Sequence, residues 1–431
     1  MPADHPLLRQ LAGEVSADRQ RATIARLVAF GTRHTASDTV SDTRGIGAAR
    51  RWVAAQFDDM ARACGGCLTI ATPSQIVTNA RLPKPTEVVD VLAIQRGTGD
   101  PNRVIVISGH LDSRNSDPLD ATGDAPGAND DGSGTAAVIE AARVLSGHRF
   151  TATLVYAVLS GEEQALNGGK VLAAYAKAQE WRVEADLNND IVGNTEGLDG
   201  ARDTTKVRVF SEGTRSTETP AEADRRRYNG GEVDSPSRQL ARMIDGLADR
   251  YLTNLDVDMI YRTDRFGRGG DQVEMLAAGF PSVRLTEPNE NYRRQHQDVR
   301  VDKGVAYGDV LAGVDFAYLA QVTRLNIVAM AALALAPAPP SEVEISGAVT
   351  ADTALKWRPD PAAASNRLWW RATTDPQWRF SRDAPPTGEA RLSGVNIDNW
   401  FFGVSALSVE GYESPVVYPG AAGRWADPSS R

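Results

Sequence analysis

Short, continuous apolar runs alternate with amphipathic stretches over most of this 431-residue chain. A run of successive apolar residues is typical of a strand covered on both faces, and an apolar stripe at helical spacing is typical of a helix packed on one side. The alternation predicts an α/β fold with a mostly parallel central sheet flanked by helices. The expected strands are 104–107, 153–159, 184–191, 206–210 and 282–286, and the expected helices are 17–30, 45–63, 134–145, 169–179, 235–251, 271–278 and 309–335.

The composition changes after the segment A-P-A-P-P, Ala336 to Pro340. Successive prolines cannot continue a helix and form a stiff spacer. We therefore expect a main domain over 1–336, a proline linker over 337–340 and a second domain over 341–431. Six of the eight tryptophans lie in this last part: Trp357, Trp369, Trp370, Trp378, Trp400 and Trp425.

Short alternating runs separated by turn residues, such as 367–372 and 401–409, predict that the C-terminal part is a small β-sandwich. Its ending, W-F-F-G-V-S-A-L-S-V-E-G-Y-E-S-P, is similar to the last strands of a fibronectin type III domain. The alternative is a β extension that packs on the main domain. The tryptophans are expected in the core of this unit rather than on a ligand platform.

Charge and hydropathy argue against two classes of partner. The net charge is -9, and the longest basic run, Arg225 to Arg227, lies among acidic residues. Nucleic acid and anionic membranes are therefore not expected as partners. The longest apolar run, 327–336, is about half of a membrane span, so no transmembrane helix is expected.

The N-terminus and the cysteines bear on localisation. The first ten residues, M-P-A-D-H-P-L-L-R-Q, lack the apolar segment of a signal peptide, which fits a cytoplasmic protein or a chain whose signal has been removed. Cys64 and Cys67 form a lone C-x-x-C, too few ligands for a structural zinc site. We expect a local disulfide, with free thiols as the alternative. A disulfide favours an exported protein, periplasmic or extracellular.

The expected strand 104–107 leads into S-G-H-L-D-S, which presents His110 and Asp112 two residues apart. Residues i and i+2 of an extended segment share a face, so Asp112 can reach an imidazole nitrogen of His110. A carboxylate that fixes the tautomer of a metal-binding histidine is a recurring arrangement. The pair therefore indicates a metal site if further ligands exist.

Further ligand-type side chains follow the next expected strands. Asp130 lies in P-G-A-N-D-D-G-S-G, Glu162 and Glu163 in S-G-E-E, Asp190 in D-L-N-N-D, and His296 in N-Y-R-R-Q-H-Q-D. Each motif alone is common in turns and on solvated faces. Together they occupy the strand ends, where open α/β sheets bind ligands. Two histidines and three carboxylates form a mixed nitrogen and oxygen set suited to two zinc ions.

This order of motifs resembles the co-catalytic dizinc aminopeptidases, in a zinc exopeptidase clan that also contains glutamate carboxypeptidases. The resemblance covers about 17–336. It implies that His110 and Asp190 bind one zinc ion, that Glu163 and His296 bind the other, and that Asp130 bridges both. It also implies that Asp112 orients His110 and that Glu162 is the general base.

The implied activity is hydrolysis of N-terminal peptide bonds by a metal-bridging water, with a peptide as substrate. One departure concerns the tyrosine that many relatives place before an S-D-H segment. The matching region here reads D-R-F-G-R-G-G-D-Q, with Arg268 at or beside the tyrosine position and Arg265 nearby. An arginine can stabilise the oxyanion, bind a substrate carboxylate or form a surface or structural salt bridge, and the second role would suit a carboxypeptidase or dipeptidase.

Three alternatives to an aminopeptidase follow. The first is a carboxypeptidase or dipeptidase on the same dizinc site, and the second is a glutaminyl cyclase with a single zinc ion. The third, a non-catalytic binding domain, is the least favoured because all five ligand positions and the base are filled. No feature of the sequence points to an oligomeric state.

Overall fold

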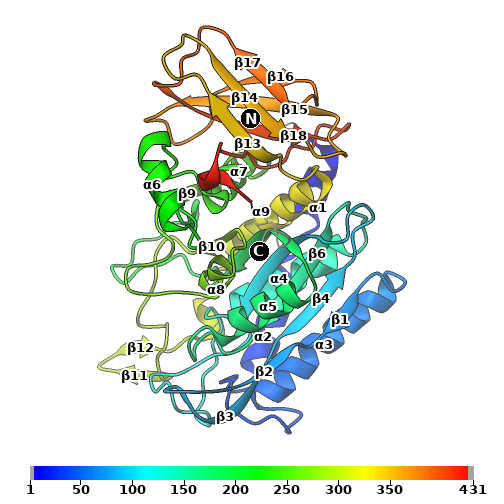
Figure 1. Cartoon of the computed structure of the whole chain (residues 1–431). Coiled ribbons are helices and arrows are strands. Elements are labelled where there is room, and N and C mark those ends of the chain that lie inside the picture. Colours follow the sequence, from blue (N-terminus) through cyan, green and yellow to red (C-terminus); the bar gives the residue numbers. More distant parts are fainter. Residues whose placement is uncertain (1–3, 426–431) are drawn as a thin grey trace.

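The computed structural model describes residues 4–425, so the first three residues of the N-terminal segment and residues 426–431 of the expected C-terminal domain lie outside it. Within the described part, the largest sheet has the strand order β1-β4-β6-β5-β7-β10-β8-β9 (Figure 1). Its strands are β1 (Thr69–Ala71), β4 (Val91–Gln95), β5 (Arg103–His110), β6 (Thr153–Leu159), β7 (Arg182–Asn189), β8 (Lys206–Phe210), β9 (Asp256–Ile260) and β10 (Ser282–Thr286).

The four central strands of this sheet, β6, β5, β7 and β10, are all parallel to one another. On one side of these strands β4 pairs antiparallel with β6, and the edge strand β1 pairs antiparallel with β4. On the other side β8 pairs antiparallel with β10, and the edge strand β9 pairs parallel with β8. Every residue of β5 and β6 is buried, as expected for strands with both faces covered. The predicted α/β class with a mostly parallel central sheet is confirmed.

Successive side chains of β5 enter two different cores, because neighbouring residues of a strand point to opposite faces. Ile105 and Ile107 join the cluster built with α2, α3, α4, α7 and α9, and Val104 and Val106 join the cluster built with α5 and α8. The helices are α1 (Pro6–Gly13), α2 (Ala17–Val28), α3 (Gly45–Ala63), α4 (Gly132–Leu145), α5 (Asn167–Ala178), α6 (Pro220–Asn229), α7 (Pro236–Tyr251), α8 (Gln272–Ala277) and α9 (Phe316–Leu335).

Helix α9 starts later than predicted. The segment 309–315 contains a short 3-10 turn, Leu311–Gly313, and Asp315 then caps α9 by accepting a hydrogen bond from the Tyr318 N–H. By length and composition α9 is apolar enough to cross a membrane, with a mean hydropathy of 1.4. However, 83% of its apolar window is buried inside the protein, where it contacts α1, α4 and α7. The core helix of a globular domain has the same composition.

The elements that sequence patterning missed lie mainly at the edges of the fold. The hairpin β2 (Ser74–Asn79) and β3 (Leu82–Val89) is largely exposed, and β3 contains Pro83 and Pro85. A proline within a segment argues against assigning that segment as a strand. An exposed strand also lacks the alternating apolar residues by which a strand is recognised in a sequence. The same holds for the exposed hairpin β11 (Arg300–Asp302) and β12 (Val305–Tyr307).

Cys64 and Cys67 are joined by a disulfide just after α3. Cys67 also contacts the backbone carbonyl of Ser146, which follows α4. The disulfide therefore lies where the C-terminal ends of these two helices meet, at the opposite end of α4 from the residues predicted to bind metal.

A C-terminal β unit, residues 341–425, follows α9 and lies at one end of the molecule (Figure 1). It contains two three-stranded sheets that share a core with Leu355, Leu368 and Phe402. One sheet is β13 (Ser341–Ser346), β14 (Thr353–Arg358) and β17 (Glu389–Leu392), and the other is β16 (Phe380–Ala384), β15 (Ser365–Ala372) and β18 (Trp400–Leu407). The likeness to fibronectin type III stays a prediction.

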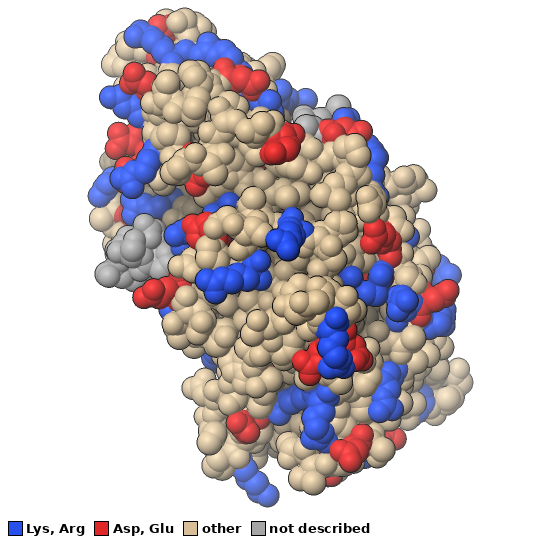
Figure 2. Space-filling view, turned by 90° about the vertical axis from the view of Figure 1, so that its right-hand side faces the viewer, with Lys and Arg blue, Asp and Glu red and all other residues tan. Residues whose placement is uncertain are grey.

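On the face seen in Figure 2, basic and acidic side chains are interspersed.

Asp186 is a buried carboxylate in the middle of β7, and it accepts hydrogen bonds from the hydroxyls of Ser108 and Ser282. Burial raises its pKa to about 6, although the two serines lower it. The folded protein therefore keeps this proton between about pH 4 and 6 while the unfolded chain loses it. Stability should fall as the pH rises through that window, by on the order of 3 kcal/mol for this group.

An Asp186→Asn variant tests this expectation. It should flatten the fall in urea-unfolding free energy between pH 4 and 7 relative to the unsubstituted protein. Equal slopes for the two proteins over that window would show that Asp186 titrates normally.

Candidate metal centre

The parallel strands bring the five predicted ligands together at one edge of the sheet. His110 is the last residue of β5, and Asp190 follows β7 directly. The predicted strand 184–191 therefore ends too late, because Asn189 is the last residue of β7. Glu163 lies in the turn after β6, Asp130 lies just before α4, and His296 lies in the loop after β10.

Asp130 is shared between two groups of potential ligands. In one group His110, Asp130 and Asp190, and in the other Asp130, Glu163 and His296, have ligand atoms within 4.8 Å of one another. Asp130 Oδ1 lies 3.3 Å from His110 Nε2, and Oδ2 lies 2.9 Å from His296 Nε2. Each carboxylate oxygen thus faces one histidine, the arrangement that a bridging ligand needs.

The electrostatics of this cluster favour a bound cation. Among the described residues, the buried atoms His110 Nε2 and Glu163 Oε1 have no hydrogen-bond partner of good geometry. Burial lowers the pKa of both histidines, but the carboxylates outweigh it: the pKa of His110 is well above its usual value, and that of His296 rises to about 10. The cluster carries an excess of negative charge that metal ions would balance. The residues therefore fit bound zinc in donor type and charge.

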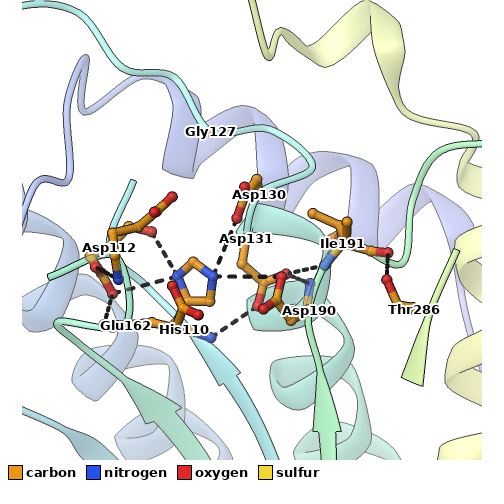
Figure 3. A network of polar contacts seen from close by, with 12 residues as sticks. His110, Asp112, Gly127, Asp130, Asp131, Glu162, Asp190, Ile191 and Thr286 are labelled. Atoms are coloured by element: carbon orange, nitrogen blue, oxygen red, sulfur yellow. Dashed lines mark hydrogen bonds and ion pairs between the residues drawn. The ribbon is translucent and has the colours of Figure 1, made fainter. Parts of the chain in front are cut away.

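Asp112 has a wider role than the sequence suggested. Its backbone carbonyl lies 3.0 Å from His110 Nδ1, closer than its carboxylate at 3.5 Å (Figure 3). The carboxylate accepts hydrogen bonds from the N–H groups of Gly161, Glu162 and Glu163. Asp112 therefore fixes both the His110 ring and the turn that carries the two glutamates.

Asp131 was not predicted to have a role, yet its hydrogen bonds join three segments of the chain. Its carboxylate accepts from the N–H groups of His110, Gly134 and Ile191. It caps α4, and an aspartate directly before a helix was the signal that could have identified it. A Cβ at Gly134 would lie 2.2 Å from the Asn189 carbonyl oxygen, so the glycine permits this close packing.

Glu162 lies beside the cluster, on the turn held by Asp112 (Figure 3). Burial raises the pKa of its carboxyl well above the usual value, with further contributions from Asp190 and Glu163. A carboxylate with a raised pKa is a stronger base than an exposed one, which suits proton transfer near neutral pH.

The two candidate arginines occupy different positions. Arg268 lies at the surface edge of its loop and donates to Glu290 at 2.5 Å. Arg265 is buried and pairs with Asp264 and Glu290. Burial lowers the pKa of Arg265, but Asp190 and then Asp264 raise it above its ordinary value. Asp190, a predicted metal ligand, therefore acts on the charge of Arg265, whereas the Arg268 side chain is 32% exposed.

Arg284, on β10, is a second charged residue that sequence reasoning missed. Its side chain is fully buried, and Nη1 lies 2.9 Å from Asp190 Oδ2. An arginine within the apolar strand S-V-R-L-T was the available signal, because a buried cation needs a partner.

Comparison with known proteins agrees with this geometry. The family model for peptidase family M28 matches residues 90–303, a range that contains all five candidate ligands. A protein of Leptosphaeria maculans, described as a probable zinc metalloprotease, is 43% identical over 422 residues, which cover 97% of this chain and 98% of that protein.

Two solved structures share the fold at low sequence identity. The Legionella pneumophila LapA aminopeptidase has a TM-score of 0.55 at 18% identity, with 78% of this chain and 76% of that chain covered. The Porphyromonas gingivalis glutaminyl cyclase has a TM-score of 0.50 at 15% identity, with 74% of this chain and 98% of that chain covered. These two structures show the fold, whereas the match to the family model and the similarity to the Leptosphaeria protein over 97% of this chain show that the chain belongs to peptidase family M28.

Proposed function

We propose that this protein is a zinc-dependent aminopeptidase that holds two zinc ions and removes residues from the N-termini of peptides. The observation that carries the proposal is the position of Asp130, with one oxygen facing His110 and the other facing His296. His110 and Asp190 would complete one metal position, and Glu163 and His296 the other. The relative described as a probable zinc metalloprotease supports zinc as the metal and peptides as the substrate.

Zinc bound at these positions would lower the pKa of an attacking water and polarise the scissile carbonyl. Glu162 accepts the proton from that water and then donates it to the leaving amine. Asp112 keeps the Glu162 turn and the His110 ring in place. Arg265 supplies positive charge where the oxyanion develops, in place of the tyrosine found in many relatives.

Metal removal gives a direct test. A chelator should abolish hydrolysis of aminoacyl chromogenic substrates, and added zinc should restore it. The reason is that the proposed reaction depends on zinc to activate the water and to polarise the scissile carbonyl. Metal analysis of the restored protein should find two zinc ions per chain. One ion per chain together with pyroglutamate formation would instead indicate a glutaminyl cyclase, whose fold this chain shares.

The polarity of cleavage is tested with blocked substrates. A substrate with a free α-amine should be cleaved far faster than its N-acetylated form, because zinc held at this site would accept the free amine as a ligand but not the acetylated nitrogen. Equal rates on the two substrates would exclude an aminopeptidase.

The two arginines give a matched comparison. Arg265→Met should lower kcat by roughly 10²-fold with little change in KM, because oxyanion stabilisation acts in the transition state. Arg268→Met should have a small effect on the same substrates. If Arg268→Met instead raises KM only for substrates with a free carboxylate, the site is that of a carboxypeptidase or dipeptidase.

We also propose that the protein acts outside the cytoplasm, because disulfides persist in oxidising compartments. The Cys64–Cys67 disulfide supports this location. Fractionation of cells that express the full-length gene would test it, and retention of the active protein in the cytoplasm would contradict it.

A further inference from the structure

Arg284 places a permanent positive charge beside only one of the two metal positions. Its side chain is 0% exposed, and Nη1 lies 2.9 Å from Asp190 Oδ2. The other Asp190 oxygen, Oδ1, lies 3.8 Å from His110 Nε2, on the side where the ligand atoms converge. Asp190 thus has one carboxylate oxygen toward the metal position, and the other oxygen is paired with the buried guanidinium of Arg284.

The loop 264–270 fixes this guanidinium in place. Nη1 also donates to the Gly269 carbonyl at 3.0 Å and lies 3.4 Å from Asp264 Oδ2. A Cβ at Gly270 would lie 2.5 Å from Nη1, so the loop packs closely against the charge. Arg284 therefore cannot move away from Asp190 without displacing the loop.

Near the second metal position the corresponding cation is Arg114, which lies farther from its carboxylate partner than Arg284 does. Arg114 Nε lies 4.0 Å from Glu163 Oε2, and its side chain is 14% exposed. Coulomb interactions weaken with distance and with access to water, so Arg114 reduces the negative charge of Glu163 less than Arg284 reduces that of Asp190. The two positions thus differ in the charge they offer to a cation, although each has one histidine, one carboxylate of its own and a share of Asp130.

We propose that Arg284 makes the metal position of His110 and Asp190 the weaker of the two, because its guanidinium neutralises Asp190 and repels the cation bound there. The inference rests on the proposed dizinc site. Arg284 is a positioning residue in this view, since it acts through Asp190 and does not touch the substrate.

Zinc titration against a chromogenic chelator tests the proposal on the full-length protein. The unsubstituted protein should bind two zinc ions with unequal affinity, and Arg284→Met should tighten the weaker one by roughly tenfold or more. Asp264→Asn should act in the opposite direction, because it removes the second carboxylate that shares Arg284. This variant keeps the proposal testable if Arg284→Met does not fold.

Arg103→Met is the matched control, because Arg103 forms a similar buried pair with Glu184 but contacts none of the ligands. It should leave both zinc affinities unchanged. Equal affinities in the unsubstituted protein, or no tightening in a folded Arg284→Met variant, would overturn the role of Arg284. Failure of the unsubstituted protein to bind a second zinc ion would instead overturn the dizinc assignment itself.

Discussion

Replacing Glu162 by Gln is expected to lower kcat by roughly 10²- to 10⁴-fold while leaving zinc content unchanged. The substitution preserves the shape of the side chain but removes the carboxylate that is proposed to accept and return the proton. Glu162 belongs to neither group of potential metal ligands, so its loss should not release metal. Steady-state kinetics on an aminoacyl substrate, with zinc content measured on the same sample, would check the result.

The neighbouring residue provides the matched control. Glu163→Gln changes the same chemical group one position away, but it removes a ligand from the Asp130 and His296 group. It should therefore lower zinc content as well as activity. If Glu162→Gln loses zinc to the same extent, Glu162 is a ligand and the assignment of the base is wrong.

The ligands could be predicted because each follows an apolar strand that is recognisable on its own. The carboxyl ends of parallel strands share one edge of a sheet. His110, Glu163 and Asp190 converge there because β6, β5 and β7 are neighbours in the sheet. Asp130 and His296 were recognised from their own motifs after expected strands, and the resemblance added their roles as bridging ligand and ligand. In the structure all five lie within the two groups of potential ligands that share Asp130, and their role as metal ligands stays a prediction.

The contacts that hold the candidate ligands in place could not be predicted, because they join residues that are distant in sequence. Arg284 contacts Asp190 only because β10 pairs with β7, and no local pattern encodes that pairing. Asp112 was expected to contact His110, but its contact with the turn at 161–163 depends on β5 and β6 lying side by side. Sequence spacing therefore identifies side chains at strand ends and misses the hydrogen bonds between loops.

The contact between the two parts of the chain is another feature without a sequence signal. Asp234, directly before the N-cap of α7, is fully buried between two arginines. Its carboxylate pairs with Arg242 of α7 at 2.8 Å and with Arg371 of β15 at 2.9 Å. Arg242 also donates to the Pro376 carbonyl, and Trp378 donates to Gln239. A buried charge cluster thus joins the C-terminal β unit to α7.

An Asp234→Asn variant should lose about 3–5 kcal/mol of unfolding free energy, because it leaves two buried guanidinium groups without their counter-charge. Urea unfolding followed by tryptophan fluorescence would measure the loss. Arg358→Met is a suitable control: Arg358 lies on β14 of the same β unit and pairs with Glu342, and the two side chains are 69% and 63% exposed. That pair should contribute about 1 kcal/mol or less.

A double variant separates the buried charge from other effects of the substitution. Arg371→Met combined with Asp234→Asn removes one of the two guanidinium groups together with the carboxylate, so it should cost less than the sum of the single changes. If Asp234→Asn leaves the unfolding transition unchanged, the β unit does not depend on this cluster for its attachment. If instead the transition splits into two steps, the cluster is what makes the two parts of the chain unfold together, and the β unit can then be tested as an independent domain.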